Sequence, residues 1–369
     1  MSLRLTPLAA SLPATVPFVG PEAMERAAGR RFRARLGANE SVFGPSPAAL
    51  AAMEAAAHGA WMYGDPEAHA LRAALAGRHG VPMEAIVVGE GIDGLLGNLV
   101  RLTVAEGDAV VTSAGAYPTF AYHAAGYGAR IVRVPYAGDH EDPEALMAAA
   151  REAEARVIYL ANPDNPMGSW HGAEAIARAI AAVPEGALLI LDEAYIDTAP
   201  EGTAPPLDAS DARVIRMRTF SKAHGLARLR VGYAVGHPEL IAAFDRVRNH
   251  FGVGRVAQAG ALAALEDEAH LAQTLERITL AREEIARIAT GAGLRPLPSA
   301  TNFVAVDCGA DAARARAVLE GLAARGVFAR MPGAPPLDRC IRISCGSGPD
   351  LALLARALPE AAAEARAAG

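Results

Sequence analysis

Short apolar runs alternate along this chain with longer segments whose apolar residues recur at helical spacing. The runs read as buried strands because they are short and rich in valine, isoleucine and leucine. We expect strands at residues 85–88, 109–112, 130–134, 157–160, 187–191, 213–217 and 230–235. The longer segments predict helices at residues 48–58, 66–79, 143–155, 172–182 and 237–248, and one more that leads from a glycine turn to residue 104.

Strands that alternate with helices indicate an α/β fold, with a mostly parallel sheet that helices cover on both faces. From about residue 256 the pattern changes. It predicts long helices at 256–291, a strand at 302–306, a helix near 311–325 and a strand at 340–344, which together suggest a smaller α+β domain. We therefore expect a large domain at residues 47–250 and a small domain made of residues 1–46 and 251–369.

Composition and charge exclude several classes of partner. The 369 residues carry a formal net charge of -6, and the basic residues do not form blocks, which argues against a nucleic-acid partner. No apolar run reaches the length of a membrane span or a signal-peptide core, so we expect no membrane partner and a cytoplasmic location. Cys308, Cys340 and Cys345 lack metal-ligand spacing, which predicts reduced thiols and no metal site.

Lys222 is the only lysine of the chain, and the other 34 of its 35 basic residues are arginine. A lysine amine can lose its proton when its surroundings lower the pKa, and it can then condense with a carbonyl group, whereas arginine stays protonated. The neighbouring segment 218–230 mixes hydroxyls, a glycine and cations around this amine. That mixture favours a reactive site over a leftover surface lysine.

Two polar segments follow predicted strands at their carboxyl ends, where open α/β sheets bind ligands. Asp192 comes directly after the run 187–191. Its carboxylate could be a metal ligand, a general base, the partner of a buried cation, or an ordinary helix N-cap. The segment 162–168 contains two prolines and a glycine, which predicts a stiff turn that presents Asn165 as a fixed donor, although an ordinary turn also fits.

The segment 89–94 follows a strand and opens a helix, so it formally matches the dinucleotide-binding pattern G-x-G-x-x-G. That pattern also needs an acidic residue about 20 residues further on, at the end of the next strand, to hold a ribose. Here Asp108 precedes that strand. We therefore interpret the turn as a helix N-terminus whose amides bind one phosphate group.

Taken in order, these segments resemble the fold-type I pyridoxal-phosphate aminotransferases, and within them the histidinol-phosphate aminotransferase group. The resemblance extends over most of the chain, and the joint order of the segments is far more specific than any one of them. Besides the segments above, it includes residues 36–40, 63–66, 116–118, 229–233, 301–303 and 341–343.

The resemblance implies roles for the candidate residues toward pyridoxal 5′-phosphate in the large domain. Lys222 would bind the cofactor covalently and move the substrate's alpha proton, and Asp192 would keep the pyridine nitrogen protonated so that the ring accepts electrons. Asn165 and Tyr195 would hydrogen-bond the phenolic oxygen, and Tyr117 would stack on the ring. The phosphate would be held by the amides of Gly91, Ile92 and Asp93 and by the side chains of Thr219, Ser221 and Arg230.

The resemblance also implies a partner and a substrate. Tyr63 would reach the phosphate of the neighbouring subunit, which makes a homodimer the functional unit. Arg342 would bind the substrate's anionic group, and Arg330 would supply a second cation for a phosphorylated substrate. We expect amino transfer between a small amino acid or amino phosphate and a 2-oxo acid. The expected pairs are histidinol phosphate with imidazole acetol phosphate and glutamate with 2-oxoglutarate, in histidine biosynthesis.

Several departures from that group keep the substrate open. Ile92 stands where a serine is common, Asp164 and Met167 replace an asparagine and a threonine, and the stretch 248–255 is unlike the group. The alternatives within the fold are another amino-acid aminotransferase and a phospho-amino-acid decarboxylase. A nicotinamide-dependent oxidoreductase is disfavoured by the missing acid, and a non-enzymatic regulator by the lack of room for a DNA-binding domain before residue 36.

Overall fold

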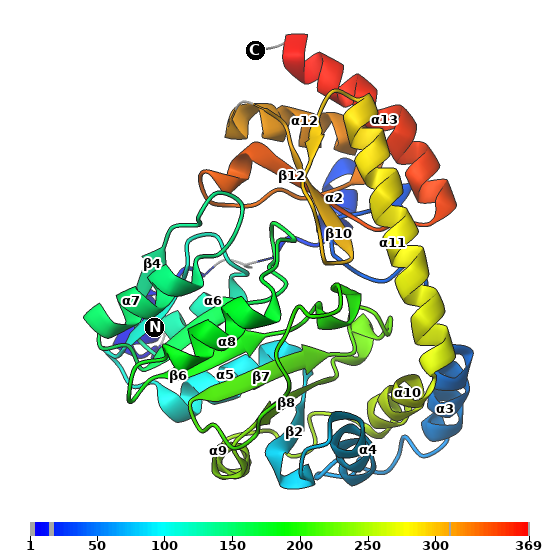
Figure 1. Ribbon diagram of the computed structural model, residues 1–369. Helices are drawn as coiled ribbons and strands as arrows, with labels where there is room; N and C mark the ends of the chain where they lie inside the picture. The colour runs from blue at the N-terminus through cyan, green and yellow to red at the C-terminus, as the bar shows by residue number, and fades with distance from the viewer. Residues whose placement is uncertain (1–3, 15–17, 310, 368–369) are drawn as a thin grey trace.

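The computed structural model describes residues 4–14, 18–309 and 311–367. Its largest sheet has seven strands in the order β2-β8-β7-β6-β5-β3-β4 (Figure 1). Of these seven strands, β8 alone runs opposite to the other six, so the predicted α/β fold with a mostly parallel sheet is confirmed. The strands are β2 (Ile86–Gly89), β3 (Ala109–Ser113), β4 (Arg130–Val134), β5 (Val157–Ala161), β6 (Leu188–Asp192), β7 (Val214–Thr219) and β8 (Gly232–Gly236).

Both faces of this sheet are buried, which explains why its strands are continuous apolar runs. Successive residues of β5 point to opposite faces: Tyr159 packs in one apolar cluster with Phe120, while Ile158 packs in another with Leu146. The covering helices are α5 (Gly91–Thr103), α6 (Thr119–Gly126), α7 (Pro143–Glu152), α8 (Ala173–Ala181) and α9 (Pro238–Ala243).

A third apolar cluster lies beside β2 and β8, where α3 (Pro47–Ala57), α4 (His69–His79) and α10 (Arg255–Glu266) pack together. The long helix α11 (Glu268–Gly291) runs from this region to the smaller sheet (Figure 1). That sheet is antiparallel, in the order β12-β10-β9. Its strands and flanking elements are β9 (Arg295–Pro296), β10 (Phe303–Asp307), α12 (Ala312–Ala324), β11 (Val327–Phe328), β12 (Cys340–Ser344) and α13 (Gly348–Ala367).

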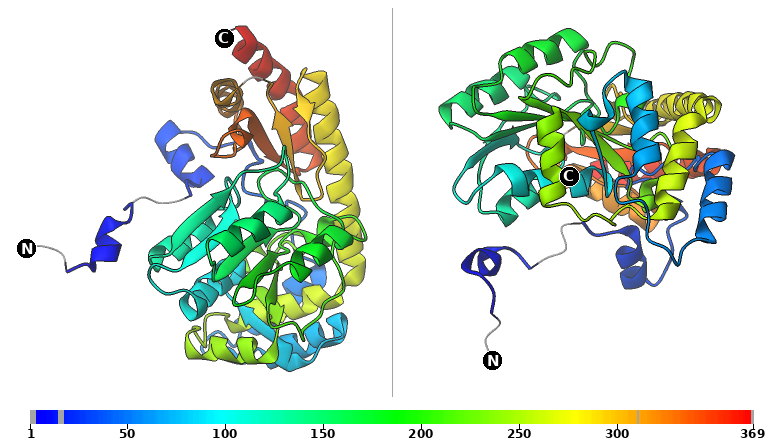
Figure 2. Two further views of the ribbon diagram at one scale, coloured as in Figure 1. Left: turned by 60° about the vertical axis from the view of Figure 1, so that its left-hand side comes forward. Right: turned by 90° about the horizontal axis from the view of Figure 1, so that it is seen from below.

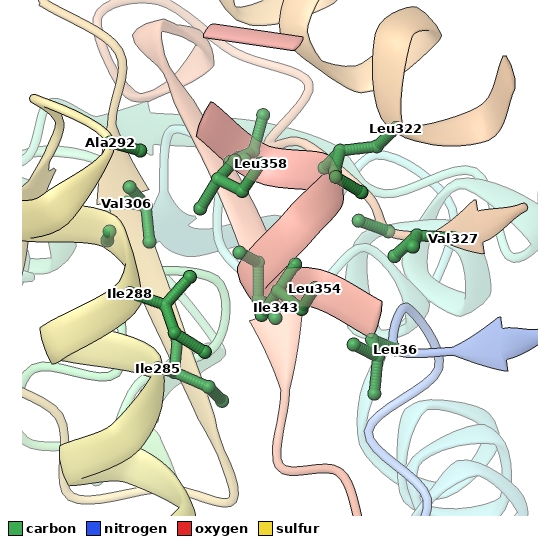
Figure 3. Packing of buried hydrophobic residues seen from close by; sticks show 14 of the residues in the cluster. Leu36, Ile285, Ile288, Ala292, Val306, Leu322, Val327, Ile343, Leu354 and Leu358 are labelled. Carbon is green, nitrogen blue, oxygen red and sulfur yellow. The ribbon is translucent and has the colours of Figure 1, made fainter. Parts of the chain in front are cut away.

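The core of the smaller part joins segments from distant parts of the chain (Figure 3). Ile288 of α11 and Leu358 of α13 pack with Val306 and Ile343 of the small sheet, and Leu36 joins them from the start of the chain. Next to Leu36, β1 (Ala34–Arg35) pairs in parallel with β11. We propose that the chain forms a large and a small domain, as the sequence predicts. Because α10 packs on α3 of the large domain, the boundary predicted at residue 250 would move to the start of α11.

Some predicted elements begin or end elsewhere. The strand predicted from residue 230 begins at Gly232, because Arg230 adopts a left-handed conformation with φ 54° after the 3-10 turn Ala227–Leu229. The helix predicted from residue 66 begins at His69, because Ala68 has φ 48° and cannot belong to a right-handed helix. The predicted helix 237–248 ends at Ala243 and continues only as a 3-10 turn. In the region 256–291, Asp267 caps α11 and separates it from α10.

The start of the described chain is extended. Helix α1 (Pro7–Ser11) lies apart from the rest of the molecule (Figure 2) and buries none of its residues. Helix α2 (Pro21–Ala28) follows it, and Arg30 then donates a hydrogen bond to the Ala324 carbonyl at the end of α12. Among the described residues, no helix combines the length and the apolar character that a membrane span requires.

Candidate active site

A cavity of about 710 Å³ lies where the carboxyl ends of the central strands face the small sheet. This is the edge of the sheet at which the sequence predicted ligand binding. Gly91 lies against the Arg230 side chain at the edge of the cavity, and Tyr63 lies outside it. The other predicted site residues all line it: Ile92, Asp93, Tyr117, Asn165, Asp192, Tyr195, Thr219, Ser221, Lys222, Arg230, Arg330 and Arg342.

Lys222 follows β7 and points its amine into this cavity. The amine donates a hydrogen bond to the Asn39 carbonyl oxygen at 3.2 Å and lies 5.4 Å from the centre of the Tyr195 ring. Burial lowers the pKa of Lys222 to about 8, and the charges of Arg342 and Arg230 act in the same direction. An amine of this kind is neutral often enough to serve as a nucleophile or a base, so a leftover surface lysine does not fit.

Asp192 ends β6 on the floor of the cavity, where it is 4% exposed. The Tyr159 hydroxyl donates to its Oδ2 at 2.7 Å, and the Ala194 amide donates to its Oδ1 at 3.0 Å. Burial raises the pKa of Asp192 to about 6, although both hydrogen bonds and the Lys222 charge oppose this rise. None of the ion pairs between described residues includes Asp192, so a cation placed beside it would offset its desolvation.

Four residues that line the cavity, Asn39, Tyr195, Asn165 and Arg342, are linked by hydrogen bonds. Asn39 Nδ2 donates to the Tyr195 hydroxyl at 3.0 Å, and Asn165 Nδ2 approaches the same oxygen at 3.5 Å. Burial raises the pKa of Tyr195 to about 12, so its hydroxyl keeps its proton near neutral pH. Arg342 Nη1 donates to Asn165 Oδ1, and its Nη2 donates to the Gly37 carbonyl at 3.1 Å.

One N–H group of the Arg342 guanidinium makes no hydrogen bond to a described residue. Its Nε is buried and has no partner among the described residues, and its guanidinium lies over the Phe303 ring at 5.2 Å. Burial lowers the pKa of Arg342. Because buried donors are normally hydrogen-bonded, this group favours an anionic ligand in the cavity.

The start of α5 forms a cradle for an anion. Gly91 has φ 73°, and a Cβ atom there would lie 2.5 Å from Arg230 Nη2, so only glycine allows this close approach. The Thr219 hydroxyl donates to Ser221 Oγ at 2.9 Å, and Arg230 Nη1 lies 3.5 Å from the same oxygen. Free amides at a helix start, two hydroxyls and a guanidinium together suit a phosphate group.

Asp93 does not turn its carboxylate into this cradle. Its Oδ1 lies 3.0 Å from His123 Nε2, and this hydrogen bond lowers the pKa of Asp93. The arrangement leaves the backbone amides at the start of α5 as the groups that face the cavity.

Aromatic rings surround another part of the cavity lining, where Phe18, Tyr117 and Arg330 lie. The Tyr117 ring stacks on Phe18 with centroids 5.8 Å apart, and the Arg330 guanidinium lies over Phe18 at 5.9 Å and over Phe328 at 5.6 Å. Arg330 Nη2 donates to the Val19 carbonyl at 2.8 Å. Arg330 therefore lines the cavity and, through this hydrogen bond, also binds the backbone near the start of the described chain.

Tyr63 is 78% exposed and packs on Phe251 with ring centroids 4.7 Å apart. Arg255 Nη2 donates to the Tyr63 carbonyl at 3.0 Å, and Arg248 Nη1 donates to the Pro66 carbonyl at 2.8 Å. The unusual stretch 248–255 therefore supports the segment around Tyr63 and does not line the cavity of its own chain.

Sequence reasoning assigned no role to three residues that shape the site. Asn39 belongs to the matched segment 36–40, and its φ of 55° is a conformation that asparagine tolerates. Tyr159 was hidden inside an apolar strand, where its hydroxyl was the one polar signal. Phe18 follows a proline-rich opening that carried no recognisable pattern.

Comparison with known proteins shows which family this chain resembles over most of its length. Residues 34–359 match the model of the family described as aminotransferase class I and II. A histidinol-phosphate aminotransferase from Anaeromyxobacter sp. is 37% identical over 346 residues, which are 92% of this chain and 94% of that protein. An aromatic amino acid aminotransferase from Mycolicibacterium paratuberculosis is 35% identical over 359 residues, 94% of this chain and 98% of that protein.

One solved structure is more similar. The crystal structure of histidinol-phosphate aminotransferase from Sinorhizobium meliloti in complex with pyridoxal-5′-phosphate is 53% identical to this chain. It superposes with a TM-score of 0.96, and the match covers 99% of both chains.

Proposed function

This chain belongs to the aminotransferase class I and II family, and we propose that it transfers amino groups between histidinol phosphate and 2-oxoglutarate with pyridoxal 5′-phosphate as cofactor. The observation that carries this proposal is the meeting of Lys222, Asp192 and the anion cradle of α5 in one cavity. The expected products are imidazole acetol phosphate and glutamate, and the reaction runs in either direction.

The residues of the cavity fit the cofactor. The close approach of Gly91 and Arg230 leaves amides and cations for its phosphate, and the desolvated amine of Lys222 suits its aldehyde. Asp192 is a buried carboxylate without an ion-pair partner among the described residues, which suits a protonated ring nitrogen. Tyr117 offers a flat aromatic face along the cavity wall.

Pyridoxal phosphate supplies an electron sink that stabilises negative charge at the substrate's alpha carbon. Asp192 would hold a proton on the ring nitrogen, and the Tyr159 hydroxyl at 2.7 Å would keep the carboxylate oriented. Tyr195 would donate its hydroxyl proton to the phenolic oxygen, with Asn39 and Asn165 fixing its position. Lys222 would take the proton from the substrate's alpha carbon and hold it during the transfer, because burial brings the pKa of its amine to about 8.

The anion-binding residues support a phosphorylated substrate. Arg342 offers a buried Nε that has no partner in the part of the chain that the structure describes, and Arg330 brings a second guanidinium to the same cavity. A substrate that carries its phosphate far from its amine needs cations at the distal end of the pocket, since planar guanidinium groups pair well with phosphate oxygens.

A second candidate is an aromatic amino acid aminotransferase. The rings of Phe18 and Phe328 flank Arg330, Tyr117 stacks on Phe18, and Arg330 Nη2 already donates to the Val19 carbonyl. A planar apolar side chain would fit that wall without a phosphate, and a relative with that name matches this chain almost as well.

A homodimer is part of the proposal. Tyr63 and Trp61 are 78% and 82% exposed, and Phe251 packs against Tyr63, so these rings form an apolar surface that a second copy of the chain would cover. In that dimer Tyr63 would reach the cofactor phosphate of the partner. We also propose a cytoplasmic location, which the free thiols of Cys308, Cys340 and Cys345 support.

The test is a panel of amines offered to the purified holoenzyme with 2-oxoglutarate as acceptor. The panel contains histidinol phosphate, phenylalanine, tyrosine and a phosphorylated amino acid, and both the keto product and released carbon dioxide are measured. We expect the highest kcat/KM with histidinol phosphate and no carbon dioxide. Preference for phenylalanine would favour the second candidate, and carbon dioxide would indicate a decarboxylase.

A further inference from the structure

Two carboxyl groups that the proposed mechanism does not use lie beside the site. Glu141 precedes α7 and is 1% exposed, while Asp164 belongs to the turn 162–168 and is 2% exposed. The two side chains lie close enough that a hydrogen bond between them acts on the pKa of each, and Glu141 Oε1 is buried with no donor among the described residues. Ionised carboxylates only accept hydrogen bonds, so a hydrogen bond between two carboxyl groups requires a proton on one of them.

The other partners of this pair are neutral donors. Ser113 Oγ donates to Glu141 Oε2 at 2.9 Å. The Tyr136 hydroxyl donates to Asp164 Oδ1 at 2.9 Å, and the Met167 amide donates to Asp164 Oδ2 at 3.1 Å. The ion pairs found between described residues include neither carboxyl group. With no cation bound to either group, two buried negative charges in contact would be strongly unfavourable.

We propose that Glu141 and Asp164 share a single proton, and that this proton fixes the turn 162–168 so that Asn165 meets Arg342. Glu141 and Asp164 are then positioning residues for the arginine that binds the substrate's anionic group. This inference rests on the proposed function for the role of Arg342, but the shared proton itself does not.

The geometry shows how the pair acts on the site. Asp164 closes its turn through its own backbone, because its amide donates to the Ser169 carbonyl at 2.8 Å and its carbonyl accepts from the Gly168 amide at 3.1 Å. Asn165 comes next in the chain and accepts a hydrogen bond from Arg342 Nη1. A movement of Asp164 away from Glu141 therefore moves the amide that orients Arg342.

The surroundings set the direction of the pH dependence. Burial raises the pKa of Asp164 to about 6 and raises the pKa of Glu141 well above its ordinary value. His171, whose Nε2 lies 2.9 Å from the Glu141 carbonyl, has its own pKa lowered by burial and adds no charge near neutral pH. The other ionisable groups that face the pair are Tyr136, Tyr159, Tyr195 and Arg342, while His140 and Asp142 face His171.

The positive charge of Arg342 and the hydrogen bond from Tyr136 both favour the ionised form of Asp164. Neither reverses the effect of burial. The pair is stable while it holds its proton, and as pH rises it must carry two negative charges. Binding of the substrate anion at Arg342 should therefore weaken with rising pH.

The first test detects the proton directly, by infrared spectroscopy of the holoenzyme at neutral pH. Asp164→Asn and Glu141→Gln each replace a carboxyl group by an amide of the same shape that donates without an ionisable proton. We expect a band of a protonated carboxyl group in the wild type that is lost in both variants and kept in Glu144→Gln. Glu144 is an exposed acid in the same part of the chain and serves as the matched control. A band that persists in both amide variants overturns the proposal.

The second test measures KM for glutamate between about pH 6 and about pH 9. In the wild type and in Glu144→Gln we expect KM to rise with pH, by at most about tenfold per pH unit because one proton is involved. In Asp164→Asn and Glu141→Gln that rise should be absent while kcat changes little. An equal rise in all four proteins overturns the positioning role. Thermal unfolding confirms that each variant is folded, and an inactive wild type with the infrared band intact would refute the proposed function alone.

Discussion

Lys222 and Asn39 are 183 positions apart in the sequence, yet the Lys222 amine donates a hydrogen bond to the Asn39 carbonyl oxygen at 3.2 Å. That oxygen also accepts from Asn302 Nδ2 at 3.0 Å, and the Asn39 side chain holds the Tyr195 hydroxyl at 3.0 Å. Asn39 thus connects the reactive amine with the start of the small sheet. Any movement of the small sheet against the large one would act on Lys222 through this contact.

The lowered pKa of Lys222 predicts how cofactor capture depends on pH. Only the neutral amine attacks an aldehyde, so the rate at which the apoenzyme takes up pyridoxal phosphate should rise with pH and level off above about 8, the pKa that burial gives this amine. Stopped-flow absorbance measures the rate. A rate that keeps rising toward pH 10.5, the ordinary value for a lysine, would mean that the amine is exposed to water.

Asp192→Asn should keep the fold and lose most of the activity. The amide can still accept a hydrogen bond from Tyr159, but it has no charge to keep the ring nitrogen protonated. We expect kcat to fall by about three orders of magnitude, as when a preorganised group is removed from a site that excludes water. Asp208→Asn, at an exposed position, is the matched control. Near-normal turnover by Asp192→Asn would show that the carboxylate is structural.

Arg330→Ala should separate the two halves of the reaction. Loss of this guanidinium removes a cation from the phosphate end of the cavity, so KM for histidinol phosphate should rise sharply while the half-reaction with glutamate is spared. The Val19 carbonyl also loses its donor, so the variant is compared with Arg330→Lys, which keeps a charge but not the fork. Equal effects on both substrates would contradict a phosphate role.

The predicted role of Tyr63 can be tested by complementation between subunits. Tyr63→Ala and Lys222→Ala should each be inactive or nearly so as homodimers. A mixed dimer contains one complete site, because the Tyr63→Ala chain keeps Lys222 and receives Tyr63 from its partner. After subunit exchange at equal amounts, we expect activity to recover to about a quarter of the wild type, since half of the dimers are mixed and each has one working site. No recovery would mean that Tyr63 serves its own chain or none.

The fold was predictable because its strands are buried on both faces. In runs such as 157–160 and 187–191 apolar and polar residues do not alternate, and a proline turn follows the first run while Gly186 precedes the second. The limits of elements were less predictable at Arg230 and Ala68, because a left-handed conformation at these residues depends on their contacts in the folded chain. A guanidinium that packs against Gly91 is such a contact, and no local pattern shows it.

The candidate site was predictable only in part. The family resemblance identified most of the candidate residues that line the cavity, and their individual roles stay predictions. It did not reveal that Asn39 contacts both Lys222 and Tyr195, or that Glu141 lies beside Asp164 in the turn that carries Asn165. Those contacts join segments that are far apart in the sequence, so they become visible only when the sheet brings the segments together.

The most direct test of this account uses the single lysine of the chain. The holoenzyme is reduced with borohydride and digested, and the cofactor-bearing peptide is identified by mass spectrometry. We predict one cofactor per chain, on the peptide that contains Lys222, and none on Lys222→Arg, which keeps the charge but not the reactive amine. Cofactor found at the amino terminus of the chain, or none retained by the wild type, would contradict the assignment of Lys222 as the cofactor-binding residue of this aminotransferase.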